Sequence, residues 1–304
     1  MFEFITWVVT NIGLSIYHLA YAITNPQLWL NWSDGEALMR FVYYGGSVEF
    51  FFVVFTTFLV LTAIGVWKNS VMWIMVRVLE AFANGVGRFF AWAGLLMVLQ
   101  QILIVFLQRI FSLSEISIGP FGYVFTRDLS WFSEELKLYN AAIVCLCCAY
   151  TFVQGGHVRV DLVYSAVTTR TKRIIDMCGS IILIMPMMVL IWMYSWFFMW
   201  RHLITPKVSA SDTLERAVMK ARAVRWNVET IGFSPNGFDA YFLFKVLIVA
   251  FCGMMFLQAI AFFWRNYLEL IEGDEASEKY FDRDSLGDDP NDETAEHLVE
   301  VKSH

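Results

Sequence analysis

The sequence predicts an all-α, polytopic integral membrane protein with about six transmembrane helices and an extracytoplasmic amphipathic helix. Hydrophobic residues make up 58% of the 304-residue chain and aromatic residues 17%, and the mean hydropathy is +0.55. Soluble proteins average about 45–50% apolar residues. Charged residues amount to only 16% and gather between long apolar runs, which is typical of a protein that lies in a bilayer.

Six apolar runs define the expected spans, since a helix of about 20 residues crosses the hydrocarbon core. The first run contains Asn11, Ser15 and His18, so it is expected to insert weakly or with help from a partner. No basic leader precedes it, so it is expected to stay in the mature protein. The runs cover residues 4–23, 48–67, 89–110, 136–154, 174–200 and 241–264.

Two local features refine these elements. Pro186 lies within the fifth run and is expected to bend that helix, because proline lacks a backbone N–H and crowds the preceding turn. Residues 71–83 precede the third run, and Met72, Val76 and Leu79 share one helical face there. That spacing predicts a short interfacial helix on the inner surface.

The distribution of basic residues sets the expected orientation. The short segment 155–173 carries Arg159, Arg170, Lys172 and Arg173, so it should face the cytoplasm. If the six predicted spans cross the membrane alternately, both termini lie in the cytoplasm and the loop 201–239 lies outside. This loop holds six basic residues, which argues against the assigned orientation.

Within that outer loop, Asp212 and Glu215 match a capping box, and apolar residues follow at helical spacing. We therefore expect an amphipathic helix on the outer surface. Its bases would contact either membrane lipid headgroups or an extramembrane partner protein.

Acidic residues concentrate at the C-terminus. Residues 272–304 carry a net charge of −9, whereas the rest of the chain carries +3. This segment is expected to be a flexible cytoplasmic tail, with a docking role as the alternative. The composition gives no support for nucleic-acid binding. The five cysteines lie in or beside apolar runs, where packing is the simplest role.

The predicted spans lack the groups that chemistry or conduction would need. Their centres carry no charge, and the deepest polar residues are amides and hydroxyls such as Gln100, Gln101 and Gln258, which typically join helices. Only His18 lies within a run, which disfavours haem ligation. No catalytic, cofactor-binding or metal residue is predicted, and an enzyme is not expected. The alternatives are a membrane anchor of a redox complex and an autonomous channel.

One stretch is more specific than hydropathy. Trp131, Glu134 and Glu135 precede the fourth run, and Gly156, His157, Arg159 and Asp161 follow it within Gly-His-Val-Arg-Val-Asp-Leu. This pattern resembles the small membrane subunit of the tripartite ATP-independent periplasmic (TRAP) transporters, the DctQ family, over residues 89–270. The chain then divides into an N-terminal extension with two spans (1–86), a DctQ-like four-helix domain (87–271) and the acidic tail (272–304).

The resemblance implies a scaffold subunit in a bacterial inner membrane. A separate large permease subunit would carry a small organic solute, typically a carboxylate, by sodium symport, and a periplasmic solute-binding protein would deliver it. Trp131 would lie at the outer interface, and Glu134 and Glu135 at a helix start, where carboxylates interact with the positive dipole end. The seven motif residues would contact another subunit or only fix helix ends.

Overall fold

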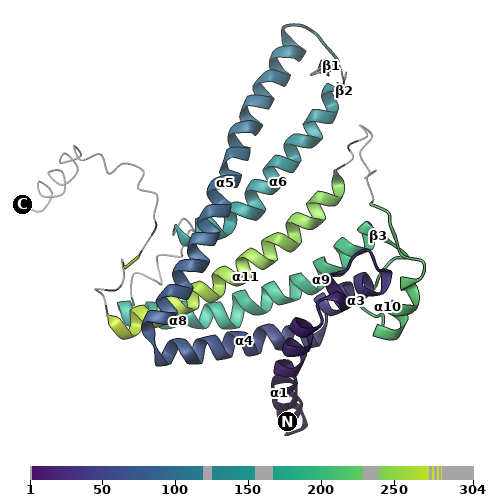
Figure 1. The fold of residues 1–304 in the computed structure, drawn as a ribbon. Coiled ribbons are helices and arrows are strands. Elements are labelled where there is room, and N and C mark those ends of the chain that lie inside the picture. Colours follow the sequence, from purple (N-terminus) through teal and green to yellow (C-terminus); the bar gives the residue numbers. More distant parts are fainter. Residues whose placement is uncertain are drawn as a thin grey trace, which may run out of the picture.

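Long helices account for most of the protein (Figure 1). The fold is seen in a computed structural model, and the predicted all-α class is confirmed. Within the described part of the chain, five helices are long and apolar enough to cross a membrane: Val48–Trp67 (α4), Asn69–Arg109 (α5), Leu129–Val153 (α6), Thr169–Leu203 and Tyr241–Glu272 (α11). The structure describes residues 2–118, 125–154, 167–228, 238, 240–273, 276, 279–280 and 282.

The first apolar run forms the helix Phe2–Thr24 (α1), but this helix is not among those five. Its polar side chains explain the difference, because they lower its mean hydropathy. One of them serves to attach α1 to α4: the hydroxyls of Ser15 and Thr56 are 2.7 Å apart and both are buried. The weak insertion predicted for this segment stays a prediction.

The predicted interfacial helix 71–83 and the span 89–110 are one helix, α5, which corrects the sequence-based division. Its 41 residues reach about 60 Å at 1.5 Å per residue, roughly twice the hydrocarbon thickness. Gly87, in the middle of this helix, lies close beside α6. A Cβ on Gly87 would lie 2.2 Å from the Cβ of Tyr150, so only glycine permits this approach.

A short antiparallel hairpin of Glu115–Ile118 (β1) and Phe125–Asp128 (β2) connects α5 to α6, with Glu115 opposite Asp128. Helix α6 begins at Leu129, seven residues before the predicted start at residue 136. The polar residues that precede the fourth apolar run therefore form the first turns of α6, beside α5 (Figure 1).

The fifth span consists of Thr169–Gly179 (α8), the π-helical segment Ser180–Ile184 (η2) and Met185–Leu203 (α9). The bend predicted at Pro186 stays a prediction, but a π-helical segment ends directly before Met185 and this proline. Proline cannot donate a hydrogen bond to the carbonyl one turn earlier, and the wider turn directly precedes it.

Helix α11 lies at the centre of the membrane part, between the α5–α6 pair and α9 (Figure 1). It extends to Glu272, eight residues beyond the predicted end at residue 264. Of the five candidate spans it has the largest buried share, 44% of its most apolar stretch. Helices α5, α6, α8 and α9 all pack against it, so α11 is the core helix of the fold.

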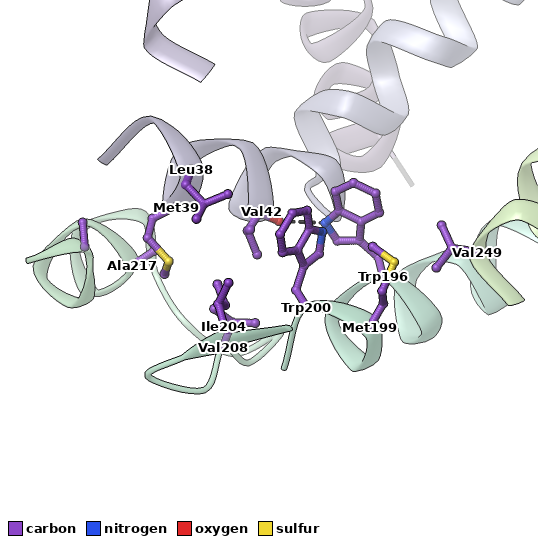
Figure 2. Packing of buried hydrophobic residues seen from close by; sticks show 11 residues of the cluster. Leu38, Met39, Val42, Trp196, Met199, Trp200, Ile204, Val208, Ala217 and Val249 are labelled. Atoms are coloured by element: carbon purple, nitrogen blue, oxygen red, sulfur yellow. Dashed lines mark hydrogen bonds between the residues drawn. The ribbon is translucent and has the colours of Figure 1, made fainter. Parts of the chain in front are cut away.

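At one end of the bundle, short elements form a separate cap core (Figure 2). Gln27–Leu30 (α2), Gly35–Gly45 (α3) and Leu214–Ala221 (α10) surround the end of α9, and Ile204–Thr205 (β3) pairs with Arg225–Trp226 (β4). Trp196 donates from its indole nitrogen to the Val42 carbonyl over 2.8 Å. The cap core contains Leu38, Met39, Val42, Trp196, Met199, Trp200, Ile204, Val208, Ala217, Ala221 and Val249.

The amphipathic helix α10 forms, but its start and its partner differ from the prediction. Thr213 is the N-cap and accepts from the Arg216 amide, whereas Asp212 forms an ion pair with Lys220. The apolar face, with Ala217 and Ala221, packs on α3 rather than on lipid. The sequence could not show this, because α3 lies almost 180 residues earlier.

Candidate functional site

Three of the seven predicted motif residues, Trp131, Glu134 and Glu135, lie in the first two turns of α6. Asp128 occupies the N-cap position of this helix, so the two glutamates do not lie at its start and do not cap it. The expected dipole role is therefore wrong, because the dipole effect fades within the first turn. The other four, Gly156, His157, Arg159 and Asp161, lie outside the described residues.

Glu135 connects α6 to α5. Its carboxylate accepts a 2.9 Å hydrogen bond from the Gln100 side-chain amide and another of 2.9 Å from the Tyr139 hydroxyl. Hydrogen bonds to a charged acceptor are stronger than neutral ones, so this pair fixes the register of the two helices. The sequence singled out Gln100 as a residue that joins helices, and the structure shows its partner.

Glu134 connects α6 to α11. It is only 9% exposed, and its carboxylate accepts from Lys137 over 2.8 Å and from the Tyr241 hydroxyl over 2.6 Å. Neighbouring residues on an α-helix point about 100° apart, so two adjacent carboxylates can serve two different helices. We call Glu134, Glu135, Gln100 and Tyr241 the glutamate joint.

Trp131 adds an aromatic layer beside this joint. Its ring lies 5.4 Å from the ring of Phe238, which is almost completely buried, and the Arg127 guanidinium lies 5.5 Å from the Trp131 ring centre. A cation over an indole face is attracted by the ring quadrupole. Trp131 therefore packs the end of α6 against the chain that leads into α11.

A second group of charges, absent from the sequence prediction, lies where α5 begins and α11 ends. Arg265 binds both carboxylate oxygens of the buried Glu80, with the Nε contact at 2.6 Å. Glu269 pairs with Arg173 at 2.5 Å and with Arg265 at 3.7 Å. This charge cluster joins α5, α8 and α11. In the sequence, Arg173 directly precedes one predicted span, and Arg265 and Glu269 follow another, but nothing there indicated that they meet Glu80.

The start of the acidic tail also contacts α5. Asp282 accepts from the Arg88 guanidinium at 2.8 and 3.0 Å and from the Asn84 amide at 3.1 Å. These bonds, above all those from Arg88, lower the pKa of the Asp282 carboxyl. Glu272 accepts from the Trp73 indole over 2.9 Å. Most of the tail beyond Asp282 lies outside the described residues, so its predicted flexibility stays a prediction.

These contacts join helices through paired side chains. Among the described residues, the buried charged side chains are Glu80, Glu134, Arg265 and Glu269, and each contacts an oppositely charged side chain of this chain. The described residues also contain no group of three or more metal-ligating side chains. The arrangement can fix the distances and the angles between these helices.

Residues 121–232 match the family described as Tripartite ATP-independent periplasmic transporters, DctQ component. We call residues 121–232, which match this family model, the DctQ region. The match confirms the predicted resemblance and supports a TRAP transporter small permease component. It covers less than half of the chain, a narrower range than residues 89–270. No curated protein and no solved structure matches the chain.

The DctQ region contains α6, α8, α9 and α10, whereas α5 and α11 lie outside it. Both glutamates of the joint belong to the DctQ region, and their partners Gln100 and Tyr241 do not. The joint therefore fastens the DctQ region to the two helices that flank it. The charge cluster does the same at the opposite end of the bundle, since Arg173 lies within the DctQ region and Glu269 beyond it.

Proposed function

We propose that this protein is the small, non-catalytic membrane subunit of a TRAP transporter in a bacterial inner membrane. The match of residues 121–232 to the DctQ component supports this most directly. In this proposal the chain is a scaffold, and a separate large permease subunit carries a small organic solute, typically a carboxylate, together with sodium. A periplasmic solute-binding protein delivers the solute.

The placement of charge supports a scaffold role. A path for ions or polar solutes normally has ionisable residues or broken helices near the middle of the bilayer. In the described part of this chain, each buried charge is paired with an oppositely charged side chain, and none lies at the midpoint of its helix. A mobile transport domain needs a fixed partner to move against, and helices held at both ends meet that need.

Reconstitution tests this division of labour. Proteoliposomes would hold this chain alone, or this chain with the large permease and the solute-binding protein, and would be given a panel of radiolabelled mono- and dicarboxylates. We expect sodium-dependent uptake only from the complete set. Uptake by the chain alone would overturn the scaffold proposal.

A second measurement tests the partner. Affinity-purified chain from native membranes should retain a polytopic protein of the same transporter class in mild detergent, identified by mass spectrometry. Recovery of a haem protein in its place, with the absorbance of haem, would favour the redox-anchor alternative.

A further inference from the structure

The C-terminal half of α5 has little contact with the rest of the chain apart from α6. Only 6% of its most apolar stretch is buried, against 44% in α11. The α5–α6 pair also projects away from the other helices (Figure 1). This surface is therefore available to something outside the chain, either lipid or a second protein.

Side-chain amides lie on this largely apolar surface, which also carries the exposed Gln108 and Arg109 near the end of α5. Gln101 on α5 and Asn140 on α6 are both exposed, and neither has a hydrogen-bond partner among the described residues. They lie on one face of the α5–α6 pair, since Leu136, one turn before Asn140, lines a groove together with Gln101. Hydroxyls on other spans behave differently: Thr57 donates to the Val53 carbonyl one turn earlier.

Acyl chains cannot form hydrogen bonds with these amides, so contact with lipid alone is unfavourable. Moving an amide from water into hydrocarbon without a hydrogen-bond partner costs about 2–7 kcal/mol, depending on the reference state. A polar side chain in a bilayer is instead commonly bonded to a neighbouring helix. Polar complementarity thus favours a protein helix that carries donors or acceptors over acyl chains.

The shape of the surface fits a helix as well. Two shallow grooves of about 350 Å³ each border Ile102, and both are lined by Gln101 and Ile102. Val105 and Phe106 line one groove, and Leu136 lines the other. A ridge between two grooves is the geometry by which helices interdigitate.

We propose that this amide face, formed by Gln101, Ile102, Val105, Leu136 and Asn140, docks on a transmembrane helix of the large permease subunit. A polar side chain of that helix would hydrogen-bond to Gln101, while its apolar side chains fill the grooves. This inference rests on the proposed function, because that function supplies a large polytopic partner inside the membrane. The outward face of the fifth span, with the exposed Leu183 of η2 and Leu190 of α9, then faces lipid.

Photocrosslinking in the assembled complex tests the location. A benzoylphenylalanine at position 102 is compared with one at Leu183, which is similarly exposed on another span. We expect a crosslink to the large permease from position 102 and none from position 183. A crosslink from position 102 only to lipid, or only to a second copy of this chain, overturns the proposal, as does a permease crosslink from position 183 alone.

A substitution tests the amide itself. Gln101→Leu keeps the side-chain size, and we expect about three- to tenfold weaker retention of the large permease, as one membrane hydrogen bond would provide. Thr57→Val, which removes a hydroxyl bonded within its own helix, should retain the permease fully. If wild-type chain retains no permease, the proposed function fails. If wild type retains it and Gln101→Leu has no effect, only the docking proposal fails.

Discussion

The hydroxyl of Tyr241, the first residue of α11, donates a 2.6 Å hydrogen bond to the carboxylate of Glu134 in α6. The next residue of α6, Glu135, binds Gln100 of α5. Three long helices thus meet at two successive carboxylates. Two residues of the predicted motif thus connect helices within the chain. Each contact can be tested by removing a single polar group.

Tyr241→Phe removes only the hydroxyl of this contact. Glu134 is nearly buried and would keep Lys137 as a partner, so we expect a loss of about 1.5–3 kcal/mol in stability, typical of a hydrogen bond to a charged group. Thermal unfolding in detergent should show a lower midpoint. Tyr194→Phe is the control, because Tyr194 is 80% exposed. Equal midpoints for the two variants would contradict the joint.

Gly87→Ala tests the close approach of α5 and α6. The new methyl group would meet the Tyr150 Cβ, and overpacking of this kind costs about 1–3 kcal/mol. Gly85→Ala, two residues earlier, meets nothing within 4 Å and should be neutral or stabilising by up to about 1 kcal/mol, because alanine favours a helix. The thermal midpoint of Gly87→Ala should therefore fall below that of the wild type, whereas the midpoint of Gly85→Ala should equal or exceed it.

Glu80→Ala tests the charge cluster. It removes the closest carboxylate partner of the buried Arg265 guanidinium and leaves Glu269 at 3.7 Å, and breaking a buried ion pair costs about 3–5 kcal/mol. Glu36→Ala breaks the exposed pair with Arg40 and should cost about 1 kcal/mol or less. Chemical unfolding of the purified variants measures both. A small effect at Glu80 would mean that the cluster does not hold α5 to α11.

The contact of Asp282 with Arg88 should depend on pH. Because the folded-state pKa of Asp282 is lowered, the contact contributes stability above the ordinary aspartate pKa and is lost as the pH falls through the lowered value. Hydrogen–deuterium exchange of the peptide around residues 276–282, corrected for intrinsic rates, should show protection at pH 7 that disappears in acid. Asp282→Asn should lack this protection at both pH values.

Cysteine labelling should locate the two ends of the bundle. In a cysteine-free background, Ser211→Cys in the cap is expected to react with an impermeant maleimide added to intact cells. Ser70→Cys, at the start of α5, should react only after permeabilisation. The reverse pattern would invert the proposed orientation and place the end of α11 outside.

Hydropathy predicted the positions of the long helices well, because each span must present an apolar surface over its whole length. It failed where local composition suggested a break. Residues 84–88 of α5 combine glycine with polar side chains, yet helical packing on Tyr150 overrides their weak propensity. The first turns of α6 are likewise polar, and their partners on α5 and α11 keep them helical.

The candidate site was predicted only in part. The sequence indicated Trp131, Glu134 and Glu135, but not what they touch. Tyr241 is separated from Glu134 by 107 residues, and Arg265 from Glu80 by 185. Single-sequence patterns record neighbours along one helix, so pairings between helices emerge only from the folded chain.

The π-helical segment Ser180–Ile184 has a consequence for the phase of its helix. An α-helix turns by about 100° per residue, and a π-helical turn accommodates one residue more than an α-turn. The side chains of α9 are therefore rotated about the helix axis, compared with their directions if α8 continued as a regular α-helix. This rotation brings Trp192 and Trp196 toward α3. Deletion of one residue from this segment would restore α-helical hydrogen bonding. It would also rotate Trp192 and Trp196 away from the cap core.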